Sequence, residues 1–241
     1  IQVGAFDGCS SLASINIPSS VTSIGSSAFG GCSSLTSINI PSSVTRIEDG
    51  AFASCSSLTT ITVDESNPMY SSENNVLLSK KDKSLIRAGV GLEKYDIPSW
   101  VTSIGMYAFE CCSSLTSINI PSSVTSIGWY VFKGCSDLKT IRFKGKMPPS
   151  IYGYSFSYIE DSKFYVPHGT LEAYKNALGG KVNNAEIIEE NQSTLYPQAL
   201  ELITPDYTSL IPSNANAKQV AAVQSKADYT ANDGLIVDAS Q

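Results

Sequence analysis

The chain has 241 residues, of which 42% are hydrophobic and only 16% are charged, and its formal net charge is −6. The charged fraction lies well below the ~25% typical of soluble proteins. The acidic balance argues against sequence-independent nucleic-acid binding, which needs a basic face, and no apolar run approaches the ~20 residues that span a bilayer.

A 23-residue repeat runs through most of the chain. Phe6, Phe29 and Phe52 recur at that step, and in the second unit Leu35, Ile38 and Ile40 have the L-x-x-I-x-I spacing of a leucine-rich repeat. The two isoleucines alternate with polar residues, as in a strand that is buried on one face. One unit cannot bury its apolar face alone, so stacking of the units is expected to make one continuous core. The sequence therefore predicts a β-rich leucine-rich-repeat solenoid of 23-residue coils over residues 1–167.

The first unit is incomplete. Ile1 aligns with Ile24, so the sequence begins in the middle of a repeat. We expect the sequence to be a fragment of a longer protein, whose earlier repeats and any signal sequence precede it.

An irregular segment at about 64–94 interrupts the period. Two apolar stretches, Val76–Leu78 and Leu85–Ile86, flank a polar turn, which predicts an inserted β-hairpin. Its positive charge suits contact with an acidic glycan or protein, or, as we favour, keeps the hairpin soluble and its edge unpaired. The basic residues in this segment are Lys80, Lys81, Lys83, Arg87 and Lys94.

The end of the repeat region predicts a cap. The last repeat strand is expected at 164–167, and residues 168–190 form a C-terminal cap with a short helix from Thr170 to Leu178. Thr170 is the expected N-cap residue, and Gly179 and Gly180 end the helix. Residues 191–241 do not repeat and are either a tail or the start of a further segment, with one candidate helix at 217–227.

Neither the cysteines nor the single histidine indicates chemistry. Five cysteines occupy one repeat position, for which disulfides, a metal site or a buried column of thiols can be considered, and we favour the column. These are Cys9, Cys32, Cys55, Cys112 and Cys135. His168 is the only histidine, so a catalytic triad would have to centre on it, but it lies in a Pro-His-Gly segment that we expect to be a surface turn. We expect no catalytic residue, no metal ligand and no cofactor.

Aromatic residues replace serines at one corner of the later coils. The pair Ser26-Ser27 becomes Met106-Tyr107 and then Trp129-Tyr130 in successive units. Stacking is expected to set Met106 beside Trp129 and Tyr107 beside Tyr130, with Trp100 nearby. Such a patch indicates either a binding surface or packing against the insert or the tail.

The outward-facing strand residues give a second candidate surface. They are expected to form one row across the sheet, with hydrogen-bonding side chains in the middle and basic and aromatic ones toward the C-terminal end. The alternative is a solvated ladder of cross-strand contacts. The row comprises Asn16, Asn39, Thr62, Asp96, Asn119, Arg142 and Tyr165.

The repeat units, of the form I-P-S-S-V-T-S-I-G-x-x-A-F-x-G-C-S-S-L, resemble the BspA-like leucine-rich repeats of bacterial surface proteins. The segment 67–78 is similar to the variant unit of that family, and the ending F-Y-V-P-x-G at 164–169 is similar to its usual terminus. The resemblance implies a secreted or outer-surface protein with an adhesive or host-protein-binding role, and it implies no catalytic residue.

Taken together, these patterns predict a non-catalytic surface protein that binds an extracellular or host protein. The residues expected to contact the partner are Asn39, Trp100, Met106, Tyr107, Asn119, Trp129, Tyr130, Arg142 and Tyr165. Two alternatives stay open: a carbohydrate-binding module that uses Trp100, Trp129 and Tyr130, and a structural spacer that presents another domain.

Overall fold

The structure, a computed structural model, describes residues 1–182 and 185–190. The chain divides into two units, Ile1–Glu189 and Glu190–Gln241, and the first of them is the repeat region. The predicted tail at 191–241 and its candidate helix lie outside the described residues.

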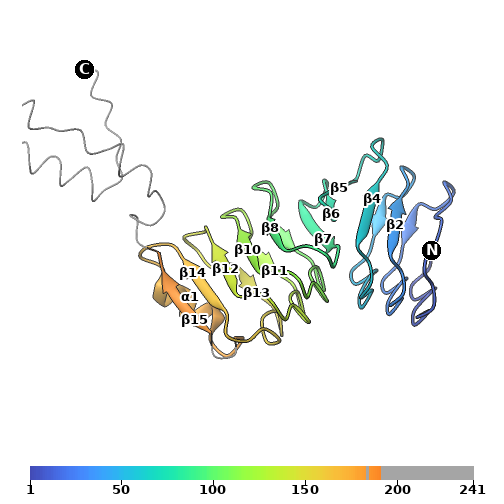
Figure 1. Cartoon of the computed structure of the whole chain (residues 1–241). Coiled ribbons are helices and arrows are strands. Elements are labelled where there is room, and N and C mark those ends of the chain that lie inside the picture. The colour runs from blue at the N-terminus through green and yellow to red at the C-terminus, as the bar shows by residue number, and fades with distance from the viewer. Residues whose placement is uncertain (183–184, 191–241) are drawn as a thin grey trace, which may run out of the picture. The chain divides into compact units, whose positions relative to one another are not determined.

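Each regular coil supplies one longer and one shorter strand, and each of these strands pairs in parallel with its equivalent in a neighbouring coil (Figure 1). In the longer strands, buried apolar residues alternate with more exposed ones, as the L-x-x-I-x-I pattern predicts. The register joins Ile118 to Ile141 and Ile141 to Phe164, which confirms the 23-residue step. The longer strands are β2 (Ser37–Ile40), β4 (Thr60–Val63), β8 (Lys94–Asp96), β10 (Ser117–Ile120), β12 (Thr140–Phe143) and β14 (Lys163–Val166). The shorter strands are β1 (Ser23–Ile24), β3 (Arg46–Ile47), β9 (Ser103–Ile104), β11 (Ser126–Ile127) and β13 (Ser150–Ile151).

Equivalent side chains form columns through the core. The ring of Phe29 stacks between those of Phe6 and Phe52, with centroids 5.3 and 5.6 Å apart. The thiols of Cys32, Cys55, Cys112 and Cys135 are buried and free, which confirms the thiol column for these four, whereas Cys9 in the first coil is exposed. The Cys55 thiol donates a hydrogen bond to the Phe29 carbonyl oxygen at 3.1 Å.

The insert contains three strands rather than the predicted hairpin alone. β6 (Val76–Ser79) and β7 (Ser84–Ala88) form the expected antiparallel pair, and β5 (Tyr70–Glu73) adds a third strand beside β6. β7 also pairs in parallel with β9, joining Leu85 to Ile104. The insert therefore takes the place of a shorter strand and extends the sheet of the later coils.

The same insert interrupts the solenoid. β2 and β4 form a sheet of their own, and β8 is the first strand of a separate five-stranded sheet that continues through β10, β12 and β14 to β15 (Glu186–Glu189). The buried hydrophobic residues correspondingly fall into two clusters. The expectation of one continuous core is wrong at this point, because the antiparallel insert lies where the regular coil pairing would have continued.

The C-terminal cap combines a helix with an unpredicted strand. Helix α1 spans Leu171–Leu178 and buries Tyr174 and Leu178, as the sequence predicts. Thr170 occupies the N-cap position, but its hydroxyl donates to the Pro167 carbonyl and does not cap the helix. The carboxylate of Glu189 in β15 accepts the Thr170 backbone N–H instead, at 3.1 Å. β15 thereby closes the sheet and holds the start of α1.

Candidate binding surface

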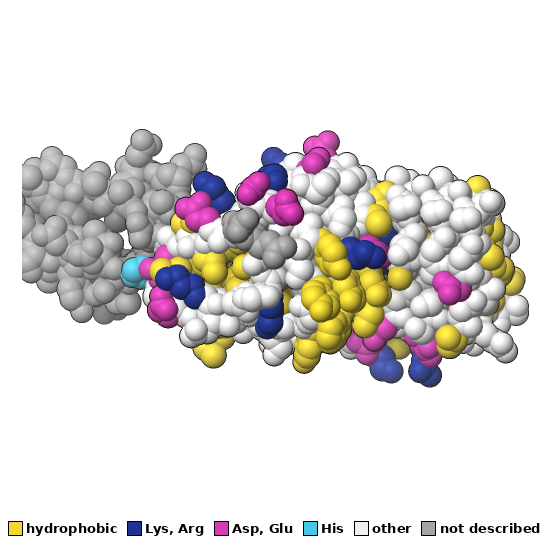
Figure 2. Space-filling model, turned by 90° about the horizontal axis from the view of Figure 1, so that it is seen from below, with side chains coloured by type: hydrophobic (Ala, Val, Ile, Leu, Met, Phe, Trp, Pro, Cys, Tyr) yellow, Lys and Arg dark blue, Asp and Glu magenta, His cyan; other side chains and the backbone are white. Residues whose placement is uncertain are grey.

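Aromatic side chains gather on the turns that follow the short strands β9, β11 and β13. The rings of Tyr107 and Tyr130 stack with centroids 5.5 Å apart and planes 5° apart. Tyr130 stacks equally closely on Tyr154, and its ring lies 6.3 Å from that of Trp129 and 6.2 Å from that of Tyr158. Figure 2 shows hydrophobic side chains gathered over the middle of the repeat region. We call Tyr107, Trp129, Tyr130, Tyr154 and Tyr158 the aromatic ledge.

The backbone at two of these tyrosines has a conformation that usually favours glycine. Tyr107 has φ +59° and Tyr130 has φ +56°, and Ser27 and Gly50 occupy the equivalent positions of earlier coils at similar φ values. The left-handed region costs an L-residue about 1–2 kcal/mol, and strained residues of this kind are concentrated at functional sites. Stacking offsets part of the cost, by about 0.5–1.5 kcal/mol for an aromatic pair. The left-handed conformation thus belongs to the repeated turn, and two large rings occupy this position in the later coils.

Packing within the chain accounts for only part of the ledge. The Tyr107 ring lies against Gly50, with its Cδ2 atom 3.7 Å from the position that a Gly50 Cβ would take. In contrast, Trp129 is 44% exposed and Tyr154 is 53% exposed among the described residues. The insert therefore does not cover the outer part of the ledge. The tail at 191–241, which is the other packing partner that the sequence suggests, lies outside the described residues.

Gly153 fixes the position of Trp129. A Cβ added to Gly153 would lie 1.8 Å from Cε3 of the indole, so the ring rests directly on the glycine backbone. One face of the indole therefore lies against Gly153, and the other face points away from that backbone. A held, exposed aromatic ring of this kind is typical of binding hot spots.

A groove adjoins the ledge at the junction between the earlier and the later coils. Its volume is about 480 Å³, within the ~300–1,000 Å³ of many ligand sites. The residues Ile47–Gly50 line one part of it, and Met106, Trp129 and Tyr152 line another. We call it the junction groove. The expected neighbours Met106 and Trp129 thus share one surface.

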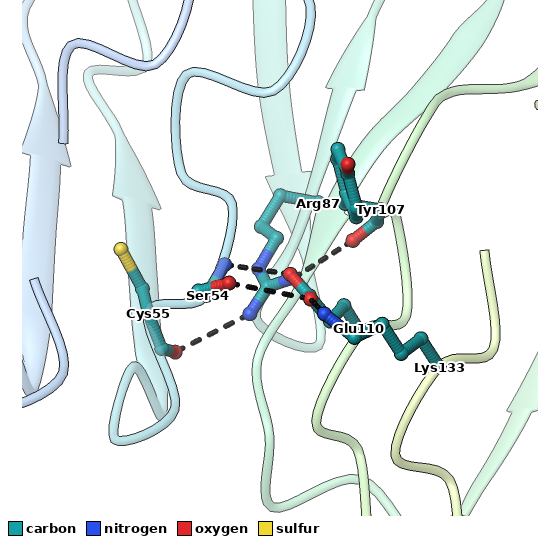
Figure 3. Close-up of polar contacts among 6 residues, drawn as sticks. All are labelled: Ser54, Cys55, Arg87, Tyr107, Glu110 and Lys133. Atoms are coloured by element: carbon teal, nitrogen blue, oxygen red, sulfur yellow. Dashed lines mark hydrogen bonds and ion pairs between the residues drawn. The ribbon is translucent and has the colours of Figure 1, made fainter. Parts of the chain in front are cut away.

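Buried polar contacts join the ledge to the earlier coils beneath the surface (Figure 3). The Arg87 guanidinium is 2% exposed and donates to the Tyr107 carbonyl oxygen at 2.7 Å and to the Cys55 carbonyl oxygen at 3.3 Å. The Glu110 side chain is 1% exposed and accepts hydrogen bonds from Ser54 and Lys133. These contacts anchor the turn that carries Tyr107.

One sequence prediction needs correction here. The sequence predicts that Arg87 adds to the surface charge of the insert. In the structure its side chain points inward from β7 and is buried under the ledge. Trp100 is exposed but lies before β9, whereas Met106 follows that strand, so the two are at opposite ends of β9. Among the described residues Trp100 has no ring contact with the ledge and does not line the junction groove. Its place in a patch with Trp129 and Tyr130 stays a prediction.

The strand row does not form one continuous surface. Asn16 lies outside any strand, and β4, which carries Thr62, is in a different sheet from β8, which carries Asp96. The row therefore divides into Asn39 with Thr62 and a second part in the later sheet. That second part consists of Asp96, Asn119, Arg142 and Tyr165.

Cross-strand contacts occupy much of this divided row. The Thr62 hydroxyl donates to the Asn39 side-chain oxygen at 2.9 Å, and the Arg142 guanidinium carbon lies 4.9 Å from the centre of the Tyr165 ring. Asn119 donates a hydrogen bond to the Asp96 carboxylate. These side chains already stabilise neighbouring strands.

Chemistry-bearing groups elsewhere are dispersed. His168 is exposed and lies 3.9 Å from the Glu189 carboxylate. Within residues 1–182 and 185–190, no three His, Cys, Asp or Glu side chains are arranged to hold a metal ion. The described part of the chain also contains no helix that is both long and apolar enough to cross a membrane.

The chain is similar to solved structures of bacterial leucine-rich repeat proteins. A leucine-rich cell surface protein from Faecalibacterium prausnitzii is 27% identical, with a TM-score of 0.55, and the match covers 81% of this chain and 64% of that one. A leucine-rich repeat protein from Eubacterium ventriosum is 26% identical, with a TM-score of 0.49, and the match covers 73% of this chain and 54% of that one. The chain thus spans between half and two thirds of these structures. Comparison with curated proteins gives no match.

The repeat itself matches a known family model. Six copies of the BspA-type leucine-rich repeat region cover residues 1–80 and 88–196. Proteins with this repeat fold are commonly surface or binding proteins and are generally non-enzymatic. The chain belongs to the family of BspA-type leucine-rich repeat proteins.

Proposed function

We propose that this chain is a non-catalytic binding module of a cell-surface or secreted protein and that it holds an extracellular or host protein on the aromatic ledge. The family supports a binding role, and the similar Faecalibacterium prausnitzii structure is that of a cell surface protein. The stacked coils supply a rigid frame, and the ledge supplies the recognition.

The stack of Tyr107, Tyr130 and Tyr154 with the exposed Trp129 carries this proposal. Tyrosine and tryptophan dominate the energetics of protein interfaces, because they bury a large area and lose few rotatable bonds. Here the rings are already held by one another and by Gly153, so a partner would not have to order them.

The decisive experiment compares the wild type with a Trp129→Ser/Tyr130→Ser variant in a binding screen against extracellular host proteins and a glycan panel. The earlier coil has Ser26 and Ser27 at these positions, so the variant should fold. Trp100→Ser is a matched control, because Trp100 is 40% exposed and also stands where other coils have serine. We expect a protein partner whose binding is lost in the double variant and kept in Trp100→Ser.

A carbohydrate ligand is the second candidate. The exposed faces of Trp129 and Tyr152 line one groove, where flat rings could stack on a sugar. If the wild type binds a glycan and the double variant does not, the ligand of the ledge is a carbohydrate and not a protein. If the wild type binds nothing in either the protein screen or the glycan panel, the spacer role is favoured instead.

A further inference from the structure

An Asp-Gly pair, Asp49-Gly50, lies in the turn that follows β3. The Asp49 side chain is exposed, and it has no hydrogen bond or ion pair within the described residues, so it can rotate toward its own backbone. Gly50 has no Cβ that would shield its backbone nitrogen. In such a pair the glycine nitrogen can attack the carboxyl carbon of the preceding side chain, because the reaction closes a five-membered ring within one molecule.

The backbone nitrogen of Gly50 is available for this attack. Its N–H donates no hydrogen bond within residues 1–182 and 185–190. The other Asp-Gly pair in the described part of the chain, Asp7-Gly8, differs in this respect, because the Gly8 N–H donates to the Gly30 carbonyl oxygen at 2.7 Å. That bond has to break before the Gly8 nitrogen can react, and the two pairs should therefore differ in reactivity.

A hydrogen bond also stabilises the charge that the attack creates. The Gly50 nitrogen loses its proton as it attacks, and the negative charge spreads onto the Asp49 backbone carbonyl oxygen. That oxygen accepts a hydrogen bond from the Ser26 hydroxyl in the preceding coil at 2.9 Å. Donors that are already in place where charge develops lower the barrier to a reaction. Within the described residues the Asp7 carbonyl oxygen accepts no hydrogen bond.

We propose that Asp49-Gly50 is a site of spontaneous backbone isomerisation. The Gly50 nitrogen forms a bond to the Asp49 carboxyl carbon, and the carboxyl hydroxyl leaves with the amide proton as water, which gives a succinimide ring. Water then adds to the ring. Cleavage of the bond between the nitrogen and the Asp49 backbone carbonyl carbon gives isoaspartate, whereas cleavage of the new bond restores aspartate. The water that is lost in the first step is regained in the second, so no other reactant is needed.

Isomerisation changes the backbone beside the aromatic ledge. An isoaspartyl linkage adds one methylene group to the main chain and keeps one free carboxylate. Gly50 lines the junction groove, and the Tyr107 ring packs against it. The reaction therefore moves the backbone that supports Tyr107. It needs no partner, so it is independent of the proposed function.

Peptide mapping of the native protein after incubation at pH 6 and 37 °C tests this proposal. Isoaspartate has the same mass as aspartate, so labelling with an isoaspartyl methyltransferase detects it and electron-transfer fragmentation locates it. Isoaspartate should accumulate at Asp49 about fivefold or more faster than at Asp7. In concentrated urea the two pairs should react at similar rates, because the hydrogen bonds that distinguish them are lost. Equal rates in the native protein, or no isoaspartate at Asp49, would overturn the site.

Two serine variants test the stabilising hydrogen bond. Ser26→Ala should slow isomerisation at Asp49 about threefold or more, because it removes the donor to the Asp49 carbonyl oxygen. Ser43→Ala is the matched control, since the Ser43 hydroxyl also donates to a carbonyl of the preceding coil, that of Val21, and its loss should leave the rate unchanged. Equal rates in the two variants, or a faster reaction in Ser26→Ala than in the wild type, would overturn the role of Ser26.

Discussion

The Glu110 carboxylate accepts a hydrogen bond from the backbone nitrogen of Ser54 at 2.6 Å, although 56 residues separate the two along the chain. This contact spans the point where the regular coil pairing stops, and the Arg87 bonds to the Cys55 and Tyr107 carbonyls cross the same junction. Buried polar contacts thus join the two halves of the solenoid where strand pairing does not.

We expect Glu110→Ala to lower the free energy of unfolding by about 1.5–3 kcal/mol, because it removes a buried carboxylate that accepts hydrogen bonds from the backbone N–H and hydroxyl of Ser54. Lys133→Ala is the control. The Lys133 side chain is 44% exposed, so water can take the place of its ammonium group beside Glu110, and we expect a smaller loss than in Glu110→Ala. Urea unfolding of both variants measures the difference, and an equal small loss in both would show that the junction does not depend on Glu110.

The reactivity of each thiol should fall as its cysteine becomes more deeply buried. Cys9 is exposed and Cys111 is partly buried, whereas the other four thiols are buried. At pH 8 an aromatic disulfide reagent should modify Cys9 quickly, Cys111 more slowly and the rest only after denaturation. Rapid modification of Cys32, Cys55, Cys112 or Cys135 in the native protein would contradict the column.

The buried thiols should also make the fold sensitive to alkali. Burial raises the pKa of Cys55 and of Cys112 to about 12, from the ordinary value of 9.0. Their protonated forms are therefore favoured in the folded state, so stability is fully present below about pH 9 and falls as the pH rises toward 12. Urea midpoints between pH 8 and 11 measure this fall, which should be shallower in Cys55→Ser than in the wild type.

Substitution of Gly153 should displace the Trp129 indole. An alanine Cβ at that position would overlap the ring, and the residue also has φ +49°. In a Trp100→Phe background, which leaves Trp129 as the only tryptophan, Gly153→Ala should shift the emission to longer wavelength. Gly169→Ala is the matched control, because Gly169 has φ +77° and nothing lies near its added Cβ. A similar shift in both variants would mean that backbone strain, and not the ring contact, is responsible.

The regular part of the fold could be predicted from the sequence because each coil repeats the same pattern of apolar residues and turns. The isoleucines of L-x-x-I-x-I, the thiol of Cys32 and the ring of Phe29 recur at fixed steps, so stacking alone places them. The stack of Tyr107 on Tyr130 was predictable for the same reason.

Features at the insert were not predictable, because no repeat sets their register. Nothing in the 23-residue repeat indicates that β7 pairs with β9 or that Arg87 points inward to two carbonyl groups. The same holds for the division of the strand row between Thr62 and Asp96.

The central claim is that a partner contacts the aromatic ledge, and oxidative footprinting of the bound and free protein tests it most directly. Trp129 and Trp100 are almost equally exposed, at 44% and 40%, so they should oxidise at similar rates in the free protein. The account predicts that a bound partner protects Trp129 and Tyr154 and leaves Trp100 unchanged. Protection of Trp100 with no change at Trp129 and Tyr154 would contradict it.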